Sequence, residues 1–449
     1  MDRLAHLDQG LKTGLKERLN VAVIGAGWAG LAAAVELVAA GAVVTVFEAA
    51  KQLGGRARSV KRHGHRLDNG QHLLLGAYRE TLRLMQTVGA NPAEVLKRLP
   101  LELLYPGAGF HLRLPRLPAP LNLAIGLFAA QGAGLGEKFA AIRFMRDLQG
   151  CNYRLATDGT VAELLDRHGQ QGKLRRYLWE PLCLAALNTA APHASAQIFV
   201  NVLRDSLGGA RADTDLLLPA ADLDRVFPSA AADFIHAHGG KIRLATRVEQ
   251  ICPQLHIEGE LFDRVILAVA PQHAASLLAR LTETTAIAAM LADYTYEPIG
   301  TAYAGYPPEV SLPCPMLGLD GGREGRLGQW VFDRGTLCAT PGVMSFVLSA
   351  QSAWDQRDNA ALVVILHDEL EEALARHLPR PLWHWVIRER RATFFCRPDL
   401  PRPAAQTPLR DLWLAGDYTC ADYPATLEGA VRSGIAAANG ALTTRPGSQ

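Results

Sequence analysis

One stretch decides the fold of this chain: NVAVIGAGWAGLAAAVELVAAGAVVTVFE, residues 20–48. Residues 20–25 are rich in β-branched apolar side chains, as in a buried strand, and residues 31–40 are strong helix formers with Gly41 placed to end the helix. Residues 43–48 have the pattern of a second buried strand. The stretch therefore predicts a strand, a glycine-rich turn, a helix and a second strand.

The spacing Gly-x-Gly-x-x-Gly gives each glycine of this turn a separate role. Gly25 permits the tight turn, Gly27 lets a pyrophosphate approach the backbone, and Gly30 lets the helix pack closely on the strand. The N-terminus of the helix then attracts the anion. Glu48 ends the second strand and can accept from both ribose hydroxyls, and two alanines follow it where an arginine would suit a 2′-phosphate. The pattern favours the ADP-ribose of FAD or NAD over NADP.

Two further turns separate FAD from NAD. GGRAR at residues 54–58 brings backbone donors, with Gly55 and Arg56, to the expected position of the pyrophosphate. LAGDY at residues 414–418 places Gly416 and Asp417 before a helix expected within residues 424–442. A cofactor that contacts both ends of the chain must be long, which favours FAD.

Composition excludes other classes of function. The 449 residues are 49% hydrophobic and 20% charged with a net charge of +2, which predicts an ordered protein without a nucleic-acid partner. Seven cysteines without a Cys-x-x-Cys pair argue against a disulfide framework and fit a reducing cytoplasm. The His63/His65 and His236/His238 pairs have no nearby third ligand, so no metal site is expected.

The strand and helix patterns recur in separate parts of the chain. Residues 240–251 are expected to form two short strands or one bent strand, and residues 262–271 a buried strand. We therefore expect an α/β fold in which a discontinuous Rossmann-like FAD-binding domain is interleaved with a mixed α+β substrate-binding domain. The predicted segments are 20–71, 236–290 and 405–445 for FAD, 72–235 and 291–404 for substrate, and 1–19 as an N-terminal amphipathic extension.

Three paired signatures then carry a resemblance: GAGWAGLAAA, Glu48 with GGRARS, and LAGDY followed by PATLEGAVRSG. Over roughly residues 20–440 the chain resembles the flavin amine oxidase and phytoene desaturase superfamily. The resemblance implies that Val248, in a strand TRVEQI, holds adenine by its backbone and that Asp417 contacts the ribityl or pyrophosphate region. It also implies that the backbone of Thr426 and Leu427 binds the pyrimidine edge of the flavin.

Within that superfamily, RLDNGQHLLLGAY (66–78) and GREGRLGQWVFDR (322–334) are similar to the squalene-associated FAD-dependent enzymes, the hydroxysqualene dehydroxylases. The resemblance implies reductive removal of the hydroxyl of hydroxysqualene to give squalene, in isoprenoid and hopanoid biosynthesis. Flavin N5 would deliver a hydride to the allylic carbon while a general acid assists the loss of water. Gly70 and Gln71 would lie beside the isoalloxazine. The candidates for the acid are His72, Asp68 and Tyr423, and the sequence does not choose among them.

Three alternative functions remain possible from the sequence. A phytoene-type desaturase would share the fold, the flavin and the substrate class. A flavin amine oxidase loses weight because the last lysine is Lys241, whereas that group commonly places a lysine beside the flavin later in the chain. A non-catalytic prenyl-lipid binding protein, of the GDP-dissociation-inhibitor kind, is disfavoured because the glycines, Glu48 and Asp417 are all present.

The expected partner is a long-chain isoprenoid, which requires a route to a lipid phase. Residues 117–146 combine large apolar residues with flanking cations, which suits an interfacial element on the inner membrane, although the same residues could instead line the substrate pocket. No spanning helix is expected. Trp330 and Phe332 alternate along a strand, where packing is favoured over a role in lining an apolar tunnel. The reductant is not identified by any motif.

Overall fold

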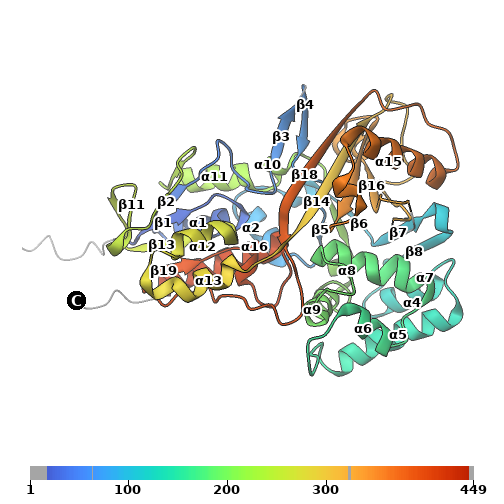
Figure 1. Ribbon diagram of the computed structural model, residues 1–449, viewed down its shortest axis with the longest axis horizontal. Coiled ribbons are helices and arrows are strands. Elements are labelled where there is room, and N and C mark those ends of the chain that lie inside the picture. Colours follow the sequence, from blue (N-terminus) through green and yellow to red (C-terminus); the bar gives the residue numbers. More distant parts are fainter. Residues whose placement is uncertain (1–17, 63, 322–324, 444–449) are drawn as a thin grey trace, which may run out of the picture.

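The computed structural model describes residues 18–62, 64–321 and 325–443, and two five-stranded sheets organise them (Figure 1). The expected N-terminal amphipathic extension (1–19) falls almost entirely on residues 1–17, which lie outside the described residues.

The first sheet is parallel throughout and contains the unit predicted from residues 20–48. Its strands, in spatial order, are β10 (Lys241–Arg243), β2 (Val43–Phe47), β1 (Asn20–Ile24), β13 (Arg264–Leu267) and β19 (Leu412–Leu414). Ile24 lies opposite Phe47 on one side and Leu267 on the other, so the strands end together. The turns that follow them therefore meet at one edge of the sheet, where ligands bind in open α/β sheets.

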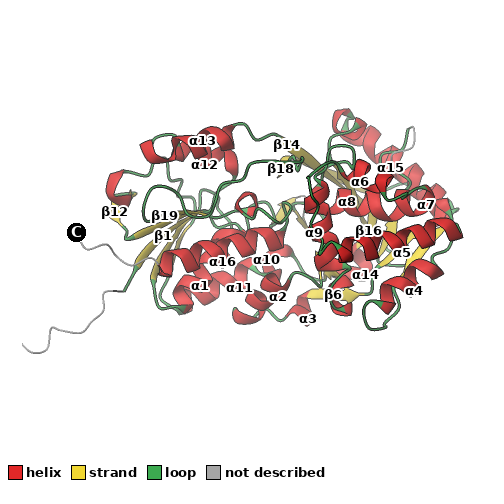
Figure 2. Cartoon of the chain, turned by 90° about the horizontal axis from the view of Figure 1, so that it is seen from below, coloured by secondary structure: helices red, strands yellow, loops and turns green. Residues whose placement is uncertain are grey.

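Helices cover both faces of this sheet (Figure 2). On one face lie α1 (Trp28–Ala39), α11 (Pro228–Ala237) and α16 (Leu427–Thr443), with α2 (Arg79–Thr87) beside α16; on the other lie α12 (Pro271–Leu278) and α13 (Thr285–Ala292). Small residues permit the close contact of α1 with α16. A Cβ on Gly434 would lie 2.1 Å from the carbonyl oxygen of Ala29.

The second sheet is antiparallel and lies in the half of the molecule that does not contain the parallel sheet. Its order is β15 (Met316–Gly318), β16 (Trp330–Asp333), β17 (Val343–Ser349), β14 (Tyr296–Gly305) and β18 (Trp383–Phe394), with α15 (Asn359–Leu374) packed beside it. Strands β14 and β18 run diagonally through the middle of the molecule in Figure 1 and connect its two halves.

A helical lobe occupies the end remote from the parallel sheet (Figures 1 and 2). It contains α4 (Leu121–Ala129), α5 (Leu135–Gly150), α6 (Val161–Arg167), α7 (Gly172–Leu174), α8 (Glu180–Leu187) and α9 (Ala196–Ser206). The hairpin of β7 (Glu102–Tyr105) and β8 (Phe110–Arg113) borders this lobe. None of the helices in the described part of the chain combines the length and the apolar character that crossing a bilayer requires.

The remaining strands and α-helices of the described residues are short. They are β3 (Ser59–Arg62), β4 (His65–Asp68), β5 (Leu74–Leu75), α3 (Pro92–Val95), β6 (Leu96–Leu99), β9 (Leu216–Pro219), α10 (Leu223–Val226), β11 (His256–Ile257), β12 (Glu260–Leu261) and α14 (Arg334–Cys338).

Two expectations about segments 240–251 and 236–290 need correction. Only β10 forms within residues 240–251, because the chain turns at Ala245, which has φ of 52°. Residues 246–250, including Val248, run as an irregular segment and not as a strand. Helix α11 packs on α1 in the layer of the parallel sheet, so a domain border at residue 236 would cut through this helix.

Candidate functional site

A cavity of about 1200 Å³ lies where the two halves meet, and its lining comes from both sheets. One end is lined by the turns that follow β1, β2, β13 and β19, and the other by apolar side chains of β7, α8, β15 and β16. Pockets that bind cofactors and small ligands have this combination of a few polar groups and an apolar wall.

The glycine turn after β1 presents its backbone to the cavity. A Cβ on Gly25 would lie 2.5 Å from the carbonyl oxygen of Ala268, and one on Gly30 would lie 1.9 Å from the carbonyl oxygen of Gly25. Gly30 therefore sets how closely α1 packs on β1 and does not line the cavity itself. A Cβ on Gly27 would meet nothing closer than Gly55 Cα at 3.9 Å. The space beside Gly27 is thus open to a ligand.

A second glycine turn lies against the first. The amide of Gly54 donates to the carbonyl of Ala26 at 2.9 Å. Gly55 has φ of 61°, and a Cβ there would approach Gly27 Cα to 3.1 Å. The two turns together form a cradle of main chain with little side-chain bulk, which suits the close approach of a pyrophosphate.

Two helix N-termini open onto the same cavity. Helix α1 begins at Trp28 after Gly27, and α16 begins at Leu427 after Thr426, whose hydroxyl accepts from the amide of Gly429 at 3.1 Å. Unpaired amides and the helix dipole make such N-termini attractive to anions and to electron-rich carbonyl groups.

The carboxylate of Glu48 is held in place by the backbone. One oxygen accepts from the amide of Ala26 at 2.7 Å and the other from the amide of Ala50 at 2.8 Å. Each carboxylate oxygen retains a lone pair, and Glu48 lines the cavity. This geometry suits the two hydroxyls of a ribose.

Arg56 joins the two ends of the chain at the cavity. Its guanidinium donates to Asp417 at 2.7 Å and to the carbonyl of Ala392 at 2.5 Å, and Asp417 lies 361 residues further along the sequence. The charge of Asp417 raises the pKa of Arg56, so the guanidinium remains a cation. Both side chains line the cavity.

The expected cofactor residues are thus brought together with one exception, Gly30. Those that line the cavity are Gly25, Gly27, Glu48, Gly55, Arg56, Gly70, Gln71, Val248, Gly416, Asp417, Thr426 and Leu427. The glycine cradle, the two helix N-termini and the fixed carboxylate match the pyrophosphate, the ring edge and the ribose of FAD in chemical type. The residues present therefore fit this cofactor.

The loop of Gly70, Gln71 and His72 forms a polar wall between the two ends. The side-chain oxygen of Gln71 accepts from Ser345 at 2.9 Å, and its amide nitrogen donates to the carbonyl of His72 at 3.1 Å. His72 Nδ1 lies 2.9 Å from the carbonyl of Gly70, and since a carbonyl only accepts, Nδ1 carries the proton. Burial lowers the pKa of His72.

The structure separates the three candidates for the general acid. Asp68 is 2% exposed, forms an ion pair with Arg334 at 3.1 Å and accepts from the amide of Leu223 at 3.0 Å, and it does not line the cavity. Tyr423 also lies outside the lining, with the guanidinium of Arg432 over its ring at 4.3 Å. Of the three side chains only His72 reaches the cavity, because the other two are buried in packing and ion pairs.

The apolar end contains residues that the sequence did not single out. Its walls include Leu101, Leu103, Leu178, Leu182, Ala185, Ala186 and Met316. Trp330 and Phe332 also line the cavity, so the packing role favoured from the sequence was incomplete. The alternation in LPLELLY (99–105) is a signal for Leu101 and Leu103, whereas no local pattern marks Arg334 as buried.

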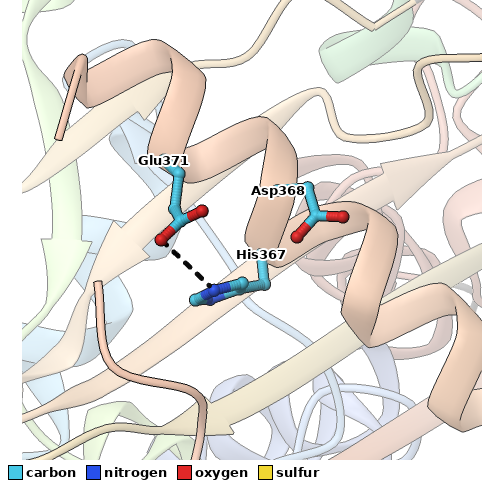
Figure 3. Close-up of side chains that lie close together, drawn as sticks. All are labelled: His367, Asp368 and Glu371. Carbon is cyan, nitrogen blue, oxygen red and sulfur yellow. Dashed lines mark ion pairs between the residues drawn. The ribbon is translucent and has the colours of Figure 1, made fainter. Parts of the chain in front are cut away.

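One cluster of metal-type side chains lies elsewhere, on α15 (Figure 3). His367, Asp368 and Glu371 have ligand atoms within 4.8 Å of one another. Protein partners already use these atoms: His367 contacts Tyr306 at 3.2 Å and Glu371 at 3.6 Å, and Asp368 pairs with Arg380 at 3.0 Å. We interpret the cluster as an ion-pair network.

The chain is similar to known proteins over most of its length. The chain matches the family model described as flavin containing amine oxidoreductase over residues 28–442. It is 30% identical to the hydroxysqualene dehydroxylase of Rhodopseudomonas palustris, over 94% of this chain and 97% of that protein. It is 23% identical to the zeta-carotene desaturase of Synechocystis sp., over 95% of this chain and 98% of that protein. The structure of an oxidoreductase from Methanosarcina mazei matches with a TM-score of 0.68 at 15% identity, over 93% of this chain and 99% of that one.

These matches confirm the expected α/β fold, the FAD cofactor and the enzymatic class, and they overturn the non-catalytic lipid-binding alternative. The chain belongs to the flavin-containing amine oxidoreductase family, and it is an FAD-dependent oxidoreductase related over nearly its whole length to hydroxysqualene dehydroxylases.

Proposed function

We propose that this enzyme removes the hydroxyl of hydroxysqualene by reduction and releases squalene. One observation carries the proposal: a single cavity joins a set of residues suited to FAD with an apolar chamber that suits a long hydrocarbon. The 30% identity to the hydroxysqualene dehydroxylase of Rhodopseudomonas palustris supports this substrate over other apolar molecules.

The apolar chamber binds the hydrocarbon chain through burial. Leu101, Leu103 and Leu182 come from the β7–β8 hairpin region and α8, and Met316 and Phe332 come from the second sheet. Each buried methylene contributes about 0.8 kcal/mol, so a long isoprenoid is retained without any charged contact.

The loss of hydroxide requires a proton donor. The hydroxyl leaves as water when it takes up one proton, and the allylic carbon gains one hydride, so atoms and charge balance. FAD, once bound and reduced, supplies the hydride. His72 is the donor in this proposal: its Nδ1 proton is engaged by the carbonyl of Gly70, which leaves the proton on Nε2 of the imidazolium for transfer. The lowered pKa makes this imidazolium a stronger acid.

The chamber also protects the reacting carbon. A developing allylic cation would be trapped by water, which would restore an alcohol. The rings of Trp330 and Phe332 and the side chain of Met316 line the chamber and exclude water from it. The apolar lining therefore binds the hydrocarbon and also prevents water from converting the cation back to an alcohol.

The test is a single-turnover experiment. Holoprotein is reduced by light in the absence of oxygen, with EDTA as the electron donor, and is then mixed with hydroxysqualene. The lipid extract is separated by gas chromatography. We expect squalene to appear as the flavin absorbance returns, in equal amounts, and no squalene from oxidised protein. If reduced flavin persists and hydroxysqualene is recovered intact, the proposal is wrong.

A second candidate, an oxidative polyene desaturase, is favoured by the 23% identity to zeta-carotene desaturase over 95% of the chain. It requires electrons to move in the opposite direction. Oxidised holoprotein mixed with zeta-carotene and a quinone acceptor would then produce longer-wavelength absorbance, whereas our proposal expects none.

A further inference from the structure

Large apolar side chains are exposed mainly at one end of the helical lobe. Of the eleven large apolar side chains that are exposed in the described residues, six lie within residues 117–139. They are Leu117, Leu121, Ile125, Phe128, Leu135 and Phe139. We call these six side chains the α4–α5 patch.

Helix α4 is apolar on both of its faces. Leu121, Ile125 and Phe128 follow helical spacing along the outer face and are 55%, 44% and 53% exposed. Leu123 and Leu127 point to the interior and are 7% and 1% exposed. A surface helix of a globular protein normally places polar residues on its outer face, so the outer face of α4 lacks the side chains that suit water.

The patch continues without a break onto α5. The rings of Phe128 and Phe139 lie 6.3 Å apart between centroids and connect the two helices. Leu135 and Phe139 are one helical turn apart and are 62% and 61% exposed. Figures 1 and 2 place α4 and α5 side by side at the end of the molecule remote from the parallel sheet.

Cations lie close to this apolar area in the sequence, and Arg143 and Arg146 line a surface pocket together with Phe139. Residues 113–146 contain a single acidic residue, Glu137, and it accepts from the amides of Gly134 and Leu174, so its carboxylate serves the fold. The cations of the same stretch are Arg113, Arg116, Lys138, Arg143 and Arg146. Two of them also have neighbouring carboxylates: Arg113 lies 3.8 Å from Glu102 and Arg146 lies 3.6 Å from Asp147.

The charge of this stretch contrasts with that of the whole chain. Five cations against one acid stand within 34 residues of a chain whose net charge is only +2. Lys138 also extends along the patch, with its ammonium 5.9 Å from the centre of the Phe128 ring. Exposed aromatic and aliphatic side chains bordered by cations are the pattern of a surface that binds anionic lipid.

The α4–α5 patch and the cavity are linked by packing through the β7–β8 hairpin. Leu101 and Leu103 line the apolar end, and the amide of Leu114, on the other strand beside Leu101, donates to the carbonyl of Leu101 at 2.9 Å. Helix α4 packs on that hairpin: a Cβ on Gly126 would lie 2.3 Å from Leu114 Cδ2. The hairpin that borders the cavity therefore also contacts α4 through Leu114.

We propose that the α4–α5 patch docks the protein on the surface of a bilayer that contains anionic phospholipid. The apolar side chains enter the boundary between headgroups and acyl chains, and the arginines and Lys138 contact phosphates. A second copy of the chain is a poorer occupant, because two such faces would bring their cations together. That the docked face gives an isoprenoid a route into the cavity rests on the proposed function; the docking itself does not.

The test uses co-sedimentation of the holoprotein with vesicles of phosphatidylcholine, with or without phosphatidylglycerol, in the absence of hydroxysqualene. The triple variant Ile125→Gln, Phe128→Gln, Phe139→Gln is compared with a matched control, Leu261→Gln, Val364→Gln, Leu382→Gln, whose residues are equally apolar and exposed elsewhere. We expect the patch variant to lose about tenfold or more in vesicle affinity and the control to bind as the wild type does.

Two double variants that each remove two arginines test the contribution of charge to docking. Arg143→Gln with Arg146→Gln is expected to lose about fivefold or more in affinity for the anionic vesicles and little for phosphatidylcholine alone, and Arg225→Gln with Arg357→Gln serves as the exposed control. Unchanged flavin absorbance and thermal midpoint show that each variant is folded. The proposal is overturned if wild-type protein does not bind anionic vesicles, or if patch and control variants bind equally.

Two outcomes distinguish docking on lipid from an interface between copies of the chain and from the proposed function. If sedimentation velocity shows a dimer that the patch variant dissociates and vesicles do not bind, the patch is an interface between copies and the lipid proposal is wrong. Because docking is measured without substrate, a protein that docks but yields no squalene contradicts only the proposed function.

Discussion

The two ends of the cavity are built from different material. The cofactor end is mostly main chain: two glycine turns, two helix N-termini and a carboxylate fixed by backbone amides. The substrate end is made of side chains that come from several separate elements. Main chain cannot be altered without moving a strand or helix, whereas side chains can be exchanged singly. The comparison implies that cofactor binding tolerates little change and that the substrate end can be reshaped.

The largest expected effect concerns the buried ion pair of Asp68 and Arg334, which lies beside the polar wall: Arg334 Nη1 is 3.5 Å from Gln71 Oε1. Arg334→Met would leave Asp68 as an uncompensated buried carboxylate, since the two side chains are 2% and 3% exposed. We expect a loss of about 3–5 kcal/mol in the free energy of unfolding, measured with urea. The double variant Asp68→Asn, Arg334→Met should recover part of the loss. A single variant that loses less than about 1 kcal/mol would show that the ion pair does not brace this wall.

His72 is expected to give the next largest effect. His72→Asn keeps a donor for the carbonyl of Gly70 but removes the acid, so the single-turnover rate should fall about 100-fold. The wild-type rate should fall as the pH rises through the pKa of His72, which burial places below the ordinary 6.5 of imidazole. The rate of the variant should not fall over this range of pH. Equal pH profiles would exclude His72 as the acid.

A pair of glycine variants compares the cofactor end with the surface. Gly30→Ala would place a Cβ 1.9 Å from the carbonyl oxygen of Gly25, so we expect a loss of about 1–3 kcal/mol in stability and a lower flavin content. Gly136→Ala adds a Cβ that meets nothing within 4 Å and should be neutral or slightly stabilising. Calorimetry and the flavin-to-protein absorbance ratio measure both. Similar values for the two variants would contradict the close packing of α1 on β1.

The smallest effect tests the ribose contact. Glu48→Gln removes the charge from a group that accepts from the amide of Ala26, and we expect FAD to bind about tenfold more weakly, or about 1.4 kcal/mol. FMN lacks the adenosine half and with it the ribose, so its affinity should not change. Flavin fluorescence titration of apoprotein measures both constants. Equal weakening of FAD and FMN would place Glu48 away from the ribose.

The parts predicted correctly from the sequence have local causes. The pattern of residues 20–48 depends on near neighbours along the chain, and strand, turn and helix formed where expected. The bend at Ala245 removed the expected strand at Val248, because hydrogen bonds from Ala245 and Thr246 to Ala50 and Glu48 direct the chain elsewhere.

What the sequence could not decide depends on distant contacts. Asp68 and Arg334 are 266 residues apart, so no local pattern shows that their pairing withdraws Asp68 from the cavity. The same holds for Tyr423, which is buried in a cluster with Trp28 and Phe227 from distant parts of the chain. For residues 117–146 the composition indicated an amphipathic surface, but only packing distinguishes the exposed Phe128 from the buried Leu127.

The ion pair between Arg56 and Asp417 has a consequence for how the enzyme is made. Asp417 leaves the ribosome 361 residues after Arg56, which at typical translation rates is about 20–70 s later. Throughout that interval the nascent chain exposes β1 and β2 without the last strand of their sheet. Flavin can therefore be enclosed only after β19 and α16 have left the ribosome.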